Sequence, residues 1–237
     1  MLIVGVVGLG ASLAGAVMQL LPRQFSAHQR QQILDWEAGQ RWRELPAGTI
    51  FPALVKYPAP SKLGGALTLH AIRIGIAKQA SCPAAADPAV GRVLTRSGCQ
   101  AMLRATYADA TNSFVVTVGV AAFPSAAQAN AARREISGLA PSGVGRLAPG
   151  VGAVKFSNTP AASFIDRRRQ ISASTSAATY VVLYTIGYAD KRPQVQASSN
   201  SYTYSEMTGL GAGVAQAVVS VLGAPVPPPH CPGTPGC

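Results

Sequence analysis

The clearest hydrophobic pattern in the chain runs over residues 99–136. Apolar and polar residues alternate over 101–108, which predicts a half-buried strand. Turn-forming residues at 109–113 lead to a strand over 114–123 that is apolar on both faces. A strand of this kind is expected at the centre of a sheet whose two faces are both covered. A helix capped by its first serine is then predicted over 125–136, with its apolar stripe packed against the sheet.

The same periodicities predict an α+β domain over the rest of the chain. From residue 67 onward the order of elements is β-α-β-β-α-β, followed by one or two further strands and a C-terminal helix. This order matches a ferredoxin-like sandwich, the split βαβ arrangement. The remaining predicted elements are strands over 49–57, 67–77, 154–156 and 180–188, and helices over 26–45, 88–97 and 205–222.

The N-terminal run 1–21 contains no charged side chain and is close to the length of about 20 apolar residues that spans a bilayer. A cleaved signal peptide would require a basic start, and a dinucleotide-binding turn would require a glycine where Leu13 stands. A single membrane anchor is therefore predicted. The expected organisation is a transmembrane helix in 1–22, a juxtamembrane helix in 23–46, an α+β domain in 47–223 and a Pro/Gly-rich tail in 224–237.

Four cysteines bear on the compartment. An even number behind an export-like N-terminus favours two disulfides, and four cysteines allow three pairings. The local pairs Cys82–Cys99 and Cys231–Cys237 are expected. The alternative is four free thiols in a reducing compartment.

The orientation of the anchor is predicted from two opposing observations. Arginines follow the apolar run closely, and the positive-inside rule would keep a domain behind them in the cytoplasm. The cysteines favour export. We predict an extracytoplasmic domain in a single-pass protein of the cell membrane. The arginines concerned are Arg23, Arg30, Arg41 and Arg43.

The net charge of the chain bears on which partners it attracts. Twenty Lys and Arg against nine Asp and Glu give a net charge of +11. Such a field attracts nucleic acid, anionic lipid or acidic envelope polymers alike. Arg167, Arg168 and Arg169 form the densest basic cluster and are the candidate anion-binding residues. Their alternative interpretation is a solvated edge or turn.

Two tryptophans are candidates for contact with a partner. Trp36 and Trp42 lie in the predicted juxtamembrane helix, behind the anchor. Tryptophan is favoured at protein and membrane interfaces because it combines a large apolar ring with a polar N–H. The alternative is that both rings pack against the domain.

No motif for catalysis or metal binding is present. The sequence lacks a Walker A loop, a nucleophile elbow and an H-E-x-x-H helix. It also lacks a C-x2-C pair, and His70 has no acid or second histidine placed to join it. We therefore predict a protein that is not an enzyme, with no cofactor and no bound metal.

The layout resembles that of membrane-anchored exported proteins of high-GC bacteria, with an N-terminal anchor, an Ala/Arg-rich α+β body and two cysteine pairs. It is similar in layout to the extracytoplasmic sensor domains of transmembrane kinases. The anchor, the cysteine pairs and the lack of catalytic motifs predict a non-catalytic domain that contacts the lipid bilayer through its anchor and binds a protein partner or envelope ligand, but not nucleic acid. The alternative function is a membrane-tethered cytoplasmic domain that binds nucleic acid or anionic lipid through its arginines.

Overall fold

The computed structural model describes residues 26–60, 67–139, 147–195 and 201–224. The chain divides into two compact units, of which the larger is Asp35–Pro225. The smaller unit combines residues 1–34 with 226–237, and its described part is Ser26 with the beginning of helix α2 (Ala27–Glu44). The predicted anchor and tail lie outside the described residues.

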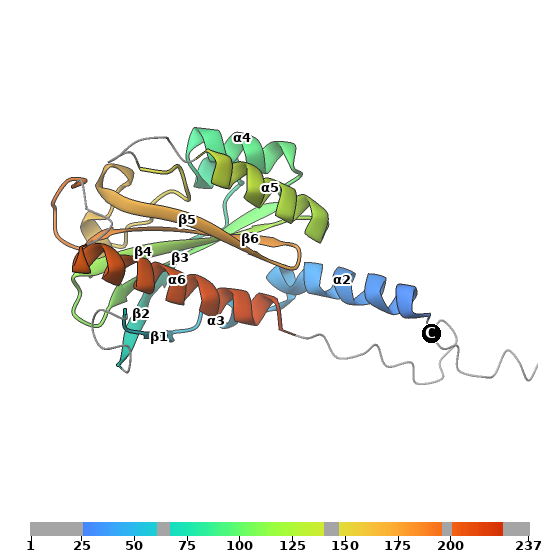
Figure 1. The fold of residues 1–237 in the computed structure, drawn as a ribbon, viewed down its shortest axis with the longest axis horizontal. Helices are drawn as coiled ribbons and strands as arrows, with labels where there is room; N and C mark the ends of the chain where they lie inside the picture. Colours follow the sequence, from blue (N-terminus) through green and yellow to red (C-terminus); the bar gives the residue numbers. More distant parts are fainter. Residues whose placement is uncertain (1–25, 61–66, 140–146, 196–200, 225–237) are drawn as a thin grey trace, which may run out of the picture. The chain divides into compact units, whose positions relative to one another are not determined.

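A curled six-stranded antiparallel sheet forms the centre of the larger unit (Figure 1). The strands stand in the order β1-β2-β3-β4-β6-β5, and every neighbouring pair is antiparallel. Their bounds are β1 (Leu54–Pro58), β2 (Thr68–Ile76), β3 (Ala101–Asp109), β4 (Phe114–Ala122), β5 (Arg169–Ala177) and β6 (Tyr180–Tyr188).

Helices cover both faces of this sheet. Helix α6 (Tyr202–Leu222) packs on one face, and helices α4 (Pro88–Arg96) and α5 (Ala126–Gly138) pack on the other (Figure 1). The connections contain a short helix, α3 (Ala47–Ile50), and the 3-10 turns η2 (Pro83–Ala85), η3 (Pro160–Ser163) and η4 (Asp166–Arg168). The α+β class and the C-terminal helix are confirmed.

Strand β4 is buried over its whole length, as its sequence predicts. Successive side chains of a strand point to opposite faces, so Val118 joins the core under α6 while Ala121 joins the core under α4 and α5. The strand pairs with β3 on one side and with β6 on the other. Its double-sided apolar pattern therefore reflects a central position with a helical layer on each face.

The strand order differs from that of the split βαβ, and the ferredoxin-like prediction is wrong. In a split βαβ, the two strands joined by a helix are parallel and separated by another strand. Here β2 and β3, which α4 connects, are direct antiparallel neighbours. Helix α4 has 9 residues and is about 13 Å long, whereas a 9-residue strand extends about 30 Å. Helix α4 alone therefore does not span the length of the sheet, and β3 starts beside the end of β2.

Residues 150–154 cross the α4 and α5 face of the sheet without forming the strand predicted at 154–156. The backbone of Val154 bonds to side chains instead of to a neighbouring strand. Its N–H donates to the hydroxyl of Thr117 at 3.0 Å, and its carbonyl accepts from the hydroxyl of Thr106 at 2.9 Å. The two hydroxyls lie 2.9 Å apart. Buried threonines on β3 and β4 therefore hold this segment on the sheet.

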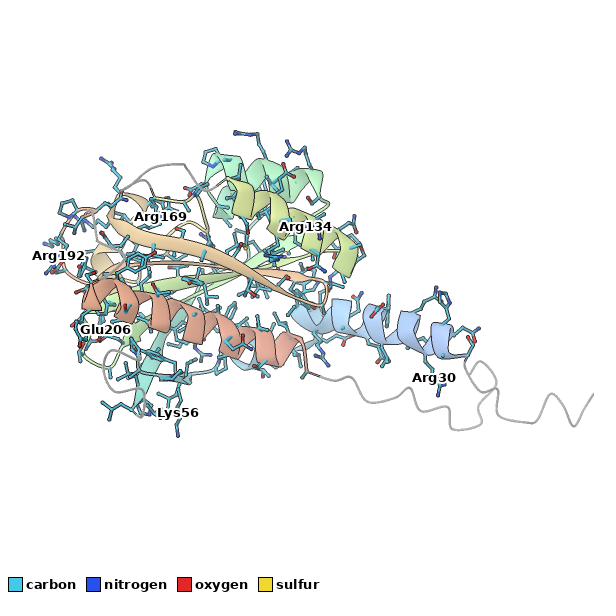
Figure 2. All side chains as sticks on the ribbon, in the orientation of Figure 1. Arg30, Lys56, Arg134, Arg169, Arg192 and Glu206 are labelled. Carbon is cyan, nitrogen blue, oxygen red and sulfur yellow. A yellow bond between two sulfur atoms is a disulfide. The ribbon has the colours of Figure 1, made fainter. Side chains whose placement is uncertain are left out.

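Two predicted elements have other boundaries in the structure, and the start of β5 falls at the arginine cluster. The segment 49–57 splits into the end of α3 and strand β1, because Pro52 interrupts it. Strand β5 begins at Arg169, beyond most of the arginine cluster (Figure 2). Helix α6 begins at Tyr202, because the Ser201 hydroxyl accepts from the N–H of Tyr204 at 3.1 Å and caps the helix three residues before the predicted start.

The C-terminal half of α2 is attached to the larger unit by hydrogen bonds. The Tyr180 hydroxyl donates to the carbonyl of Ala38 at 2.6 Å and accepts from the N–H of Trp42 at 3.2 Å. Arg41 donates to the carbonyl of Leu222 at 2.8 Å, which satisfies an acceptor left open at the end of α6. The part of α2 after Asp35 is thus held by the start of β6 and the end of α6.

Candidate functional site

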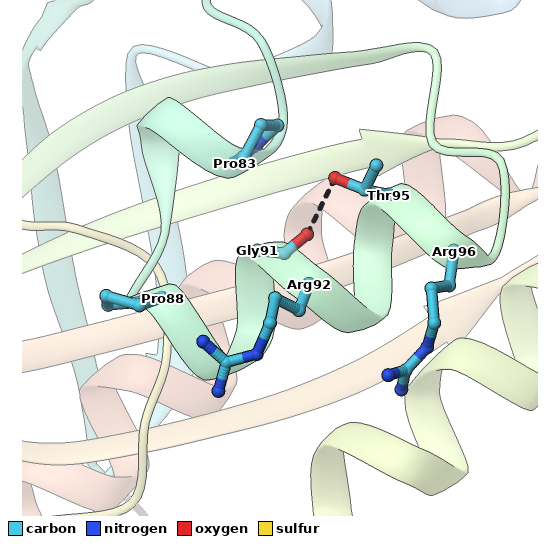
Figure 3. Close-up of a pocket in the computed structure, with 6 residues that line it drawn as sticks. All are labelled: Pro83, Pro88, Gly91, Arg92, Thr95 and Arg96. Atoms are coloured by element: carbon cyan, nitrogen blue, oxygen red, sulfur yellow. Dashed lines mark hydrogen bonds between the residues drawn. The ribbon is translucent and has the colours of Figure 1, made fainter.

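A groove of about 500 Å³ lies beside α4 on the surface of the larger unit (Figure 3). This volume is in the range of small-molecule sites, roughly 300–1,000 Å³. Arg92 and Arg96 are four residues apart on α4, so they share one side of the helix. The residues that line the groove are Pro83, Pro88, Gly91, Arg92, Thr95 and Arg96.

A disulfide encloses the segment that forms the groove. Cys82 and Cys99 are bonded, which confirms the predicted local pair. Cys82 immediately precedes η2, and Cys99 follows α4 by three residues. All lining residues therefore belong to the loop that this bond closes. Cys231 and Cys237, the second predicted pair, lie outside the described residues.

The groove owes its shape to a close approach between η2 and α4. A Cβ on Gly91 would lie 3.0 Å from the Cα of Pro83, a contact with backbone that has little freedom to move. The hydroxyl of Thr95 donates to the carbonyl of Gly91 at 2.8 Å, which orients this side chain along the helix. Glycine is therefore required for η2 to pack this tightly against α4.

An ion pair holds the start of α4. Asp87 precedes the helix and its carboxylate accepts two hydrogen bonds from Arg169, at 2.8 Å from Nη1 and 2.7 Å from Nη2. The same carboxylate accepts from the N–H of Gly150 at 2.8 Å. The side chain of Arg169 is only 7% exposed, and that of Asp87 is 21% exposed. Asp87 thus ties the groove segment to β5 and to the crossing segment 150–154.

The three arginines predicted as an anion-binding cluster occupy different environments. Arg167 is exposed, whereas Arg168 is half-buried and donates to the carbonyl of Ser163 at 2.6 Å. Arg169 is buried against Asp87. The structure does not gather the three guanidinium groups on one exposed surface, because Arg169 is buried and Arg168 is half-buried.

Positive charge is available at the groove instead. Arg92 is exposed and makes no hydrogen bond or ion pair with any other residue in the described parts of the chain. Arg96 forms an ion pair with Glu135 of α5, with side chains that are 64% and 47% exposed. An exposed pair of this kind contributes little to stability and is readily exchanged. The groove therefore presents one uncompensated guanidinium and a second that is loosely paired.

The two tryptophans of α2 differ in exposure. Trp42 packs against the core under α6, and the guanidinium of Arg43 lies 4.5 Å from the centre of its ring. Trp36 is 63% exposed. Trp42 therefore has a structural role in attaching α2, and Trp36 remains the candidate for contact with a partner.

The described residues contain no group of three or more His, Cys, Asp or Glu side chains that could hold a metal ion. The buried carboxylate of Asp109 accepts from the N–H groups of Thr111 and Phe114, at 3.1 and 2.6 Å, and closes the turn between β3 and β4. Asp166 accepts from the N–H of Ala153 at 2.8 Å. These acids hold backbone segments in place. Among the helices of the described residues, none has the length and apolar character needed to cross a bilayer.

The groove was not found from the sequence. Its arginines could have been noticed as a pair spaced by four residues on the outer face of a predicted helix, inside the Cys82–Cys99 loop. The proline of η2 carried no comparable pattern, because the turn it forms is only 3 residues long. The contact between η2 and α4 depends on tertiary packing.

Comparison with family models, with curated proteins and with solved structures gave no match.

Proposed function

We propose that the chain is a single-pass membrane protein whose α+β domain lies outside the cytoplasm and binds a protein partner or ligand of the cell envelope without catalysis. The observation that carries this proposal is the disulfide between Cys82 and Cys99. Disulfides persist in oxidising compartments and are rare in the bacterial and eukaryotic cytosol. The apolar run 1–21 would supply the anchor.

The groove beside α4 is the binding site in this proposal. An open concave surface, an apolar lining and available positive charge coincide there. The disulfide and the Asp87–Arg169 pair hold its two ends, so the groove is largely preformed. A preformed site loses less conformational entropy when it binds, which favours a binding role.

Thiol labelling in intact cells tests the location. A Cys231→Ser/Cys237→Ser variant restricts the measurement to Cys82 and Cys99. A membrane-impermeant maleimide should label this variant only after treatment with an impermeant reductant. A Cys82→Ser/Cys99→Ser version of the same variant, which has no cysteine left, gives the background. Labelling that requires lysis and no reductant would place the domain in the cytoplasm and overturn the proposal.

A second candidate function rests on the net charge of +11 and on the arginines that follow residues 1–21. In this alternative, the domain is cytoplasmic and binds nucleic acid or anionic lipid. Binding of either kind releases counterions, so the affinity would fall steeply as salt is raised. The thiol-labelling result decides between the two candidate functions. If the affinities for DNA and for acidic vesicles did not change with salt concentration, the second candidate would be excluded.

A further inference from the structure

We infer that the groove beside α4 binds an amphipathic anion, a molecule with an anionic oxygen headgroup and an apolar chain. This inference rests on the proposed function, in which the groove is the binding site, and specifies the chemistry of its ligand. The shared chemistry is a carboxylate or phosphate headgroup, from a free fatty acid or from a lipid.

The apolar half of the ligand is matched by the lining. Pro83 and Pro88 present ring carbons to the groove, and Gly91 presents no side chain at all. The hydroxyl of Thr95 is occupied by the carbonyl of Gly91, so its methyl group is the part of that side chain free for contact. An apolar chain buried here gains about 25 cal/mol per Å² of surface removed from water.

The anionic half is matched by the two arginines on one side of α4 (Figure 3). Arginine is suited to oxygen anions because its planar fork of N–H donors fits a carboxylate or phosphate. The carboxylates of α5 and of the residue before α4 are already engaged. Glu135 pairs with Arg96, and Asp87 is occupied by Arg169. Arg92 is therefore the principal anchor for the headgroup, and Arg96 would contribute by exchanging Glu135 for the ligand.

The size of the groove favours a small ligand over a protein surface. A stable protein interface buries roughly 800 Å² on each partner, whereas a cavity of about 500 Å³ encloses a small molecule. A protein partner would have to extend well beyond the lining residues. An amphipathic anion fits both the apolar lining of the groove and the positive charge of its two arginines.

Photocrosslinking of the full chain in lipid nanodiscs tests the inference. The probes are a diazirine-bearing dodecanoic acid and the matching diazirine-bearing alcohol, which share the chain and differ in charge. Mass spectrometry then measures the crosslink yield on residues 83–96. The acid should label this segment, and Arg92→Glu should lower that yield about fivefold or more while the yield of the alcohol stays unchanged. Arg134→Glu on the neighbouring helix α5 is the matched charge control and should leave both yields unchanged (Figure 2).

Competition identifies the headgroup. Unlabelled octanoate or octyl phosphate should reduce crosslinking by the acid, and the stronger competitor indicates a carboxylate or a phosphate source. If the acid and the alcohol gave equal crosslink yields, and Arg92→Glu changed neither, the groove would not recognise the charge of the headgroup and the inference would be wrong. Absence of labelling on 83–96 would exclude this ligand class at the groove. Neither result alters the thiol-labelling outcome, so the compartment is judged separately.

Discussion

Arg169 and Asp87 stand 82 positions apart in the chain and are joined by two parallel hydrogen bonds, with both nitrogens of the guanidinium fork on the two carboxylate oxygens. The pair connects the first residue of an edge strand to the residue that precedes α4. The carboxylate of Asp87 also accepts a hydrogen bond from the N–H of Gly150. One ion pair thus joins the sheet, the crossing segment and the groove.

Removal of this carboxylate should strongly destabilise the domain. Asp87→Ala removes both short hydrogen bonds to the buried guanidinium of Arg169 and leaves it only the exposed carboxylate of Asp166, 3.6 Å from Nε, so we expect a loss of about 3 kcal/mol in the free energy of unfolding. Urea denaturation followed by circular dichroism measures the change. The matched control is Asp190→Ala, which removes the carboxylate of the exposed Asp190–Arg192 pair and should leave the midpoint unchanged. Equal effects of the two variants would contradict a structural role for the buried pair.

Two glycines of α6 should respond oppositely to alanine. A Cβ on Gly213 would overlap the Cβ of Tyr57, which is held in β1 and cannot rotate away. Gly213→Ala should therefore destabilise the domain by about 1–3 kcal/mol. Gly209 is in the same helix, and its added Cβ would lie 3.7 Å from Pro60, an ordinary contact. Gly209→Ala should stabilise by about 0.5–1 kcal/mol, because glycine is unfavourable inside a helix. Thermal unfolding of both variants tests the pair of predictions.

Loss of the disulfide should affect both stability and the groove. Cys82→Ser/Cys99→Ser opens a loop of sequence separation 17, which corresponds to about 3 kcal/mol by the entropy of loop closure. The free energy of unfolding from urea titrations should fall by that amount. Crosslinking of the dodecanoic acid probe to 83–96 should fall as well, because the lining residues all lie in the opened loop. An unchanged crosslink yield would show that packing alone maintains the groove.

Glu206 should make stability depend on pH in the acid range. Burial raises the pKa of this carboxyl above its ordinary value of 4.5, and the charge of Asp109 raises it further. A raised pKa means that the folded state holds the proton more tightly than the unfolded chain. Its contribution is therefore fully present below pH 4.5 and is lost as the pH rises through the raised pKa.

Glu206→Gln removes this dependence. The variant should match the wild type at low pH and be the more stable of the two at neutral pH. Urea midpoints measured from acid to neutral pH provide the comparison. A difference that is constant across this range would show that the effect of the substitution is not due to protonation of Glu206.

The two tryptophans can be measured separately because the chain has only these 2. Trp42→Phe leaves Trp36 as the sole tryptophan, and Trp36→Phe leaves Trp42, and excitation at the red edge of the absorption band excludes the tyrosines. Acrylamide should quench Trp36 more strongly than Trp42, since Trp36 is 63% exposed and Trp42 packs against the core. If Trp36 contacts the bilayer or a partner, its quenching should decrease in nanodiscs or when the partner is added. Equal quenching of the two variants in detergent would contradict the described position of α2.

Several parts of the fold could be read from local patterns. The two-sided apolar run of β4 predicted a central strand, and Ser125 marked the start of α5, where its hydroxyl accepts from the N–H of Gln128 at 3.3 Å. Gly98, with a φ of +80°, follows the helix predicted over 88–97, at a position where glycine commonly ends a helix. Burial periodicity, caps and helix ends depend on residues close in sequence, so they can be predicted from one sequence alone.

The strand order, the fate of the arginine cluster and the groove were decided by tertiary contacts. Arg169 is buried because Asp87, from a segment 82 positions away, accepts two hydrogen bonds from its guanidinium, whereas the neighbouring Asp166 is exposed and lies 3.6 Å from Nε. Likewise β2 and β3 are direct antiparallel neighbours, although the connection between them, residues 77–100, is long enough for the parallel crossover that the element order predicted. Pairings between distant residues depend on which surfaces complement each other in three dimensions, and the local pattern of apolar and polar residues does not predict them.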